Sequence, residues 1–72
     1  MKPATASVLA LLKQQGRLGV TPALALERVG TFRLAARISE LRADGHVIET
    51  TIIRTPTGKH PARYVLQDPR SL

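Results

Sequence analysis

Two groups of basic side chains are the residues of this sequence whose types and spacing best suit ligand binding. Arg33 and Arg37 are four residues apart, and the small Ala36 lies between them. The second group comprises Arg54, Lys59, His60 and Arg63. A guanidinium group binds a phosphate, or the O6 and N7 atoms of guanine, through paired hydrogen bonds. Both groups therefore indicate recognition of a polyanion rather than a chemical reaction.

The overall charge of the chain agrees with this interpretation. Its 72 residues contain 11 Lys and Arg against 5 Asp and Glu, which gives a formal net charge of +6. Such a charge favours nucleic acid or an anionic membrane surface as partner, and a basic protein that is merely soluble is the alternative. The apolar run of residues 8–12 is far shorter than the about 20 residues of a membrane span. We expect a cytoplasmic protein that begins at or near Met1 and has no membrane partner.

Other kinds of chemistry find little support in the sequence. There is no cysteine, and His46 and His60 are the only histidines. We therefore expect no metal site, no cofactor and no small-molecule ligand. Asp44 and His46 have no positioned nucleophile with which to form a catalytic triad, so we expect a protein that is not an enzyme.

The N-terminal segment has the apolar spacing of an amphipathic helix. Its apolar stripe consists of Val8, Leu9, Leu11 and Leu12. Thr5 or Ser7 is the expected N-cap, and Gly16 ends the helix after Gln15. Alternating apolar residues then make 17–20 a possible short extra strand.

A second helix is predicted directly afterwards. Thr21 is the expected N-cap, and Pro22 occupies the first helical position, where a missing N–H costs no hydrogen bond. The helix extends to Val29. Its predicted core contacts are Leu24, Leu26 and Val29.

A third helix follows after a very short joint formed by Gly30 and Thr31. Thr31 is its expected cap, and the helix runs from Phe32 to Asp44, with Phe32 in the core or in an N-terminal staple. The side chains predicted to face inward are Leu34, Ile38 and Leu41. The side chains predicted to face outward are Arg33, Ala36, Arg37, Glu40 and Asp44. Two helices joined in this way form a helix-turn-helix pattern.

Strand character begins after Gly45. Residues 47–53 are rich in β-branched side chains, residues 55–61 contain the Gly and Pro of a turn, and residues 62–66 form a second strand. We expect a β-hairpin whose inner face carries Ile48, Ile52, Tyr64 and Leu66. Residues 1–66 are the expected domain, and residues 67–72 are a frayed C-terminal tail.

Three helices followed by a hairpin are the element order of an α+β winged helix-turn-helix. Residues 31–48 form a capped helix with inward Leu and Ile, ending in a Leu-x-x-x-Gly-x-x-Ile phrase. This stretch resembles the third helix and following strand of winged-helix DNA-binding domains. The resemblance covers roughly residues 7–66, and the wording of the third helix resembles short winged-helix proteins of bacteriophages and prophages. It implies double-stranded DNA binding, with the third helix in the major groove and the hairpin, or wing, on the adjacent backbone.

The resemblance also implies roles for individual residues. Arg33 and Arg37 are expected to contact bases or phosphates, and Ala36 allows close approach. Glu40 either accepts from cytosine N4 or pairs with Arg37 on a solvated helix face. Thr31 caps the helix or holds a phosphate at its N-terminus. The wing residues expected on phosphates or in the minor groove are Arg54, Lys59, His60 and Arg63, although such charge also protects exposed hairpins from aggregation.

Two functional classes follow from this pattern. The first is a small transcriptional regulator or an accessory factor in phage recombination or replication. The second is a protein-interaction adaptor or inhibitor that binds host machinery through the same basic surface. A homodimer on DNA is also expected, through the outer strand face with Val47 and Ile53 or through the first helix, and a monomer is the alternative.

Overall fold

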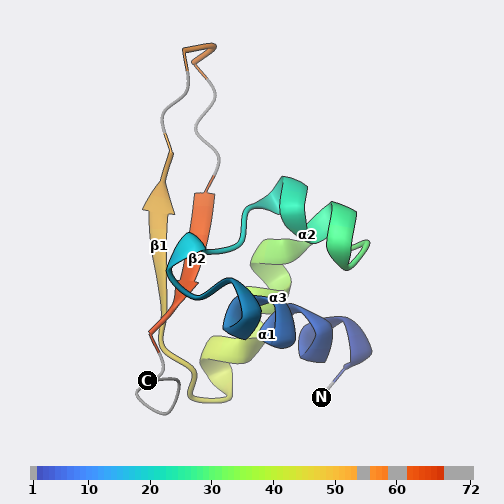
Figure 1. Cartoon of the computed structure of the whole chain (residues 1–72). Helices are drawn as coiled ribbons and strands as arrows, with labels where there is room; N and C mark the ends of the chain where they lie inside the picture. The colour runs from blue at the N-terminus through green and yellow to red at the C-terminus, as the bar shows by residue number, and fades with distance from the viewer. Residues whose placement is uncertain (1, 54–55, 59–61, 68–72) are drawn as a thin grey trace.

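Three helices and a two-stranded antiparallel sheet follow one another in a computed structural model that describes residues 2–53, 56–58 and 62–67 (Figure 1). The helices are α1 (Pro3–Gln15), α2 (Pro22–Arg28) and α3 (Leu34–Ala43). The strands are β1 (Ile48–Ile52) and β2 (Ala62–Leu66). This order confirms the α+β architecture of three helices and a hairpin that the sequence predicts. No helix among the described residues is long and apolar enough to cross a lipid bilayer.

Helix α1 begins earlier than the hydroxyl residues of its first turns indicate. Lys2 is the N-cap residue in an extended conformation, and Pro3 takes the first helical position. The prediction that Thr5 or Ser7 caps the helix is therefore wrong, because proline at the first position already supplies a start. Thr5 lies inside the helix and is almost completely buried. The predicted stop is confirmed, since Gly16 follows Gln15 with a positive φ of 54°.

The connection between α1 and α2 contains one residue that joins the sheet. Residues 16–18 form a short 3₁₀ turn, η1 (Gly16–Leu18), so the extra strand expected over 17–20 is reduced to Val20. The Val20 N–H donates to the Tyr64 carbonyl at 2.8 Å, and the Tyr64 N–H donates back to the Val20 carbonyl at 2.9 Å. Val20 thus extends the hairpin by a single bridge on the open side of β2.

Helix α2 confirms its predicted start. The Thr21 hydroxyl accepts a hydrogen bond from the Leu24 N–H at 3.2 Å, and Pro22 is the first helical residue. The predicted core contacts are only partly correct. Leu24 and Val29 pack on the core, as predicted, and Ala25 is fully buried. Leu26 is exposed, because it follows Ala25 by about 100° around the helix.

Helix α3 starts two residues later than its sequence indicates. The Thr31 hydroxyl accepts from the Arg33 N–H at 3.2 Å, so it closes a turn before the helix instead of capping the helix itself. Arg33 is the N-cap residue, with no side-chain cap bond, and Asp44 follows the last helical residue. The joint between α2 and α3 therefore spans residues 29–33, and a predicted cap at Thr31 is wrong.

The hairpin pairs Ile48 with Leu66 at its base and Ile52 with Ala62 toward its free end. Ile48 is buried in the core, as predicted for the inner face. Ile52 is on the same strand face but remains 55% exposed, which corrects the prediction that it lies over the helices. Ile52 is the last residue of β1, four residues beyond the buried Ile48, and in Figure 1 the strand runs away from α3 toward the free end of the hairpin. Val47 is exposed, as the predicted outer face requires.

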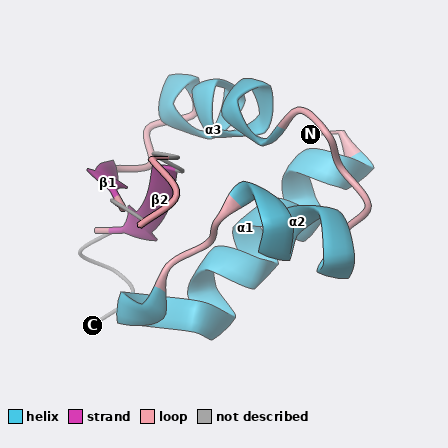
Figure 2. Ribbon diagram, turned by 90° about the horizontal axis from the view of Figure 1, so that it is seen from above, coloured by secondary structure: helices cyan, strands magenta, loops and turns pink. Residues whose placement is uncertain are grey.

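An aliphatic core joins all of these elements. Its buried apolar residues are Val8, Leu11, Leu12, Val20, Ala25, Leu34, Ile38, Leu41 and Ile48. Seen along the hairpin, α3 lies across from α1 and α2, with the sheet at one end (Figure 2). The side of α3 turned away from α1 and α2 is consequently left uncovered by the other described elements.

Candidate nucleic-acid interface

Helix α3 carries three kinds of surface around its circumference. Leu34, Ile38 and Leu41 are buried, as predicted. Arg37 and Glu40 are partly buried on the flank that faces α1, which we call the flank of α3. The small exposed side chains beyond this flank, which we call the open face, are Ala35, Ser39 and Ala43. Ala43 lies at the border with the flank, where it lines a pocket with Glu40, and the longer Arg42 is exposed beside the open face. Helix α3 therefore has a polar flank that faces α1 and an open face whose small side chains are exposed to solvent.

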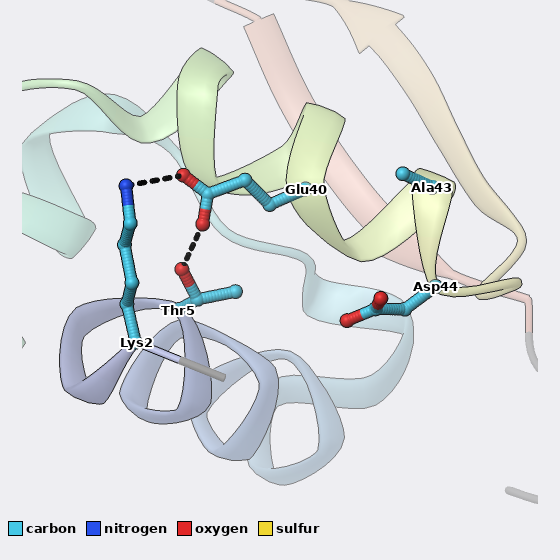
Figure 3. Close-up of a pocket in the computed structure, with 5 residues that line it drawn as sticks. All are labelled: Lys2, Thr5, Glu40, Ala43 and Asp44. Carbon is cyan, nitrogen blue, oxygen red and sulfur yellow. Dashed lines mark hydrogen bonds and ion pairs between the residues drawn. The ribbon is translucent and has the colours of Figure 1, made fainter.

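Glu40 is the centre of a polar cluster between α3 and the start of α1 (Figure 3). The buried Thr5 hydroxyl donates to its Oε2 atom at 2.5 Å. Its Oε1 atom lies 2.7 Å from Arg37 Nη2 and 3.8 Å from Lys2 Nζ. The Thr5 hydrogen bond first, and then the charges of Arg37 and Lys2, hold the pKa of Glu40 below its ordinary value of 4.5, although partial desolvation acts in the opposite direction.

Arg37 is held on the flank by this cluster. Only 18% of its side chain is exposed, and its Nε atom is buried without a hydrogen-bond partner. The ion pair with Glu40 that the sequence left as an alternative is therefore present. Contact of Arg37 or Glu40 with a base stays a prediction, and it would require this pair to separate.

Arg33 and Ala36 lie toward the N-terminal end of α3. Arg33 is exposed at the N-cap position, next to the turn that the Thr31 hydroxyl closes. Ala36 is partly buried at the border between the flank and the open face. The structure thus brings Thr31, Arg33 and Ala36 together at one end of the helix, while Arg37 and Glu40 turn toward α1.

The exposure of Phe32 contradicts another prediction from the sequence. Instead of entering the core or a staple, its side chain is 87% exposed in the turn before α3. The physical reason is the late start of the helix, because Phe32 precedes the first helical turn and cannot follow the inward stripe that begins at Leu34.

Ser39 and Arg42 are two residues of α3 that the sequence reasoning missed. At about 100° per residue, Ser39 lies about 140° from Leu34 around the helix, whereas Arg37 lies only about 60° away. A helical wheel was therefore the signal that would have placed Ser39 on the open face. Arg42 acts as a strut, since its Nη2 atom donates to the Ile48 carbonyl at 2.7 Å and to the Thr50 hydroxyl at 2.9 Å.

Arg63 is the basic wing residue that the structure describes. It pairs with Thr51 across the hairpin and is partly buried. Its aliphatic stem crosses Gly19, where an added Cβ would lie 2.6 Å from Arg63 Cγ, and Gly19 has a φ of 73°. Any larger residue at Gly19 would therefore both clash and strain the backbone.

The free end of the hairpin is described at residues 56–58. Residues 56–58 are exposed there, at the end farthest from the helices (Figure 1). Arg54, Lys59 and His60 lie outside the described residues, so their predicted contacts stay predictions. The C-terminal tail predicted over 67–72 is likewise described only at Gln67, whose N–H donates to the Val47 carbonyl at 2.7 Å. Among the described residues, no cluster of three or more His, Cys, Asp or Glu is arranged to hold a metal.

Comparison with known proteins identifies a family for the chain. The family model described as "Winged helix-turn-helix domain" matches residues 4–69. No curated protein and no solved structure matches the chain significantly. The match spans all three helices and both strands, so it covers the whole of the candidate interface.

Proposed function

Because the chain belongs to the winged helix-turn-helix domain family, we propose that it is a non-enzymatic protein that binds double-stranded DNA. Helix α3 enters the major groove, and the hairpin lies against the adjacent phosphate backbone. In this arrangement the open face of α3 contacts the bases, and the polar contacts of the flank fix the orientation of α3 relative to α1.

The observation that carries this proposal is the open face of α3. Ala35, Ser39 and Ala43 are small, and an α-helix with small side chains fits closely into the major groove of B-DNA. The carboxylate of Glu40, the acidic residue within this helix, is turned away and paired with Arg37 and Lys2. An approaching phosphate strand therefore meets little negative charge on this side.

Positive charge is available around the open face. Arg33 is exposed at the N-terminal end of α3, and Arg42 is exposed near its C-terminal end. The hairpin adds the basic residues that the sequence places in the wing. These cations, together with the net charge of +6, support attraction to phosphates that does not depend on base sequence.

In biological terms, we propose a small transcriptional regulator, or an accessory factor in DNA recombination or replication. A homodimer would match the paired half-sites that such proteins read, and it belongs to the same proposal. Sedimentation of the free protein and of its DNA complex tests that part, because one copy per duplex at all concentrations would exclude the dimer.

A titration of the protein with duplex DNA at several salt concentrations tests the proposed function. With about four or five phosphate contacts, we expect log K to fall against log salt with a slope near −4, at roughly −0.9 per contact. Affinity should then fall about a hundredfold or more between 50 and 200 mM salt. Absence of binding at low salt would contradict DNA binding and favour the protein-interaction adaptor.

A further inference from the structure

Phe32 is the most exposed of the large apolar side chains that the structure describes. It is 87% exposed, and the turn that carries it is closed by the hydrogen bond between the Arg33 N–H and the Thr31 hydroxyl. The ring is thus presented to solvent from a turn with a defined backbone. Single exposed apolar residues are ordinary on protein surfaces, so exposure alone assigns no role to Phe32.

The position of Phe32, directly before α3, indicates a role for its exposed ring. It directly precedes the exposed Arg33, and the open face of α3 begins two residues further on at Ala35. In Figure 1, α3 begins on the side of α2, and the free end of the hairpin extends toward that same end of the molecule. Phe32, Arg33 and the first residue of the open face are therefore all exposed within four consecutive residues at the N-terminal end of α3.

We propose that Phe32 is a specificity-determining residue that contacts the C5 methyl group of thymine in the major groove. The inference rests on the proposed function, because it requires the N-terminal end of α3 to enter that groove. Thymine is the base that presents an apolar group on the major-groove floor or edge, and an aromatic ring packs favourably against a methyl group. Arg33, its neighbour, supplies the adjoining phosphate or guanine contact.

Stacking on single-stranded bases is a weaker explanation for the same ring. Proteins that bind single strands use several aromatic side chains as successive platforms, whereas this chain has two aromatic residues, and Tyr64 packs against the core. Phe32 is therefore suited to one local apolar contact beside a helix in the groove.

Binding to two matched duplexes tests the proposal. The duplexes have the same sequence, but one contains deoxyuridine in place of every thymidine, which removes the methyl groups and keeps the hydrogen-bonding atoms. We expect the wild-type protein to prefer the thymine duplex by about fourfold for each contacted methyl group. Phe32→Ala should bind both duplexes equally, and Phe32→Leu should keep part of the preference.

Leu18→Ala is the matched control. Leu18 is also an exposed apolar residue, 73% exposed, but it lies in η1, which precedes α2 and packs against β2. This variant should keep the wild-type preference. Equal binding of both duplexes by the wild-type protein, or an unchanged preference in Phe32→Ala, would overturn the role of Phe32 and leave DNA binding intact. Binding to neither duplex at low salt would overturn the proposed function and this inference together.

Discussion

The flank and the open face of α3 are built from the same ten-residue helix, yet their side chains are used in opposite ways. On the flank, Arg37 and Glu40 are bound to each other, and Glu40 also binds Thr5 of α1 and the N-cap residue Lys2. On the open face, small side chains such as Ser39 are exposed. Charge on a helix therefore does not by itself mark its binding surface. In α3 the charged flank fixes the position of the helix against α1, and the small side chains of the open face allow another molecule to approach closely.

The sharpest separation of the two roles comes from adjacent residues, Ile38 and Ser39. Ile38 is fully buried, so Ile38→Ala should lower the free energy of unfolding by about 2–5 kcal/mol, enough to unfold much of so small a domain. Ser39→Ala should change that free energy by less than about 0.5 kcal/mol, because the side chain is exposed. Urea unfolding of both variants measures the difference, and similar losses for the two would contradict the assignment of faces.

Arg33 and Arg37 provide the next comparison, because they are the same residue type on different sides. Arg33→Ala should weaken DNA binding and reduce the steepness of the salt dependence by about 0.9, with unchanged stability. Arg37→Ala should instead lower the free energy of unfolding by about 1 kcal/mol, through lost packing and lost pairing. Salt titrations and thermal unfolding of both variants distinguish these effects.

Arg37 also decides between the two interpretations that the sequence left open. If Arg37 leaves Glu40 to bind a base, Arg37→Ala should relax discrimination between duplex sequences by about 1–3 kcal/mol. Such a loss of discrimination would show that the flank of α3 enters the groove. It would contradict the assignment of DNA contact to the open face alone.

The ionisation of Glu40 should make the stability of the folded protein depend on pH. Its pKa is lowered in the folded protein, so its stabilising contribution is fully present above pH 4.5 and is lost as the pH falls through the folded-state pKa. Glu40→Gln should therefore unfold at a lower temperature than the wild-type protein at pH 7, and the gap should shrink at pH 3. Thermal unfolding at both pH values tests this, and a gap that widened in acid would contradict the pairing.

Lys2 should show the smallest effect. Its Nζ atom is 3.8 Å from Glu40, and 71% of its side chain is exposed, so water and salt screen the interaction. Lys2→Gln should leave the unfolding temperature and the DNA affinity nearly unchanged. A clear loss of stability would show that the start of α1 contributes more to the flank of α3 than its exposure indicates.

Local patterns in the sequence predict the elements of this fold well. The Thr21–Pro22 start of α2 and the inward stripe of α3 follow from interactions within a few residues along the chain. The start of α3 was misplaced because the Thr31 hydroxyl serves the turn that precedes the helix. Short-range signals compete at such joints, and sequence alone does not rank them.

The candidate site was less predictable because its decisive contacts are distant in sequence. Thr5 and Glu40 are 35 residues apart, and no local pattern indicates that one hydroxyl would draw the flank of α3 toward α1. The exposure of Ile52 has a similar origin, since strand alternation predicts its face but not how far the hairpin extends past the helices.

The single bridge between Val20 and Tyr64 indicates the order in which the parts of this small domain fold. The hairpin can form from neighbouring residues, but the bridge joins its second strand to a segment that precedes α2 and α3. Its two hydrogen bonds require closure of a long loop, so they should form late and slow the final step of folding. The contacts that form last are the first to open, so the amide protons of Val20 and Tyr64 should exchange with solvent faster than those of the core helices.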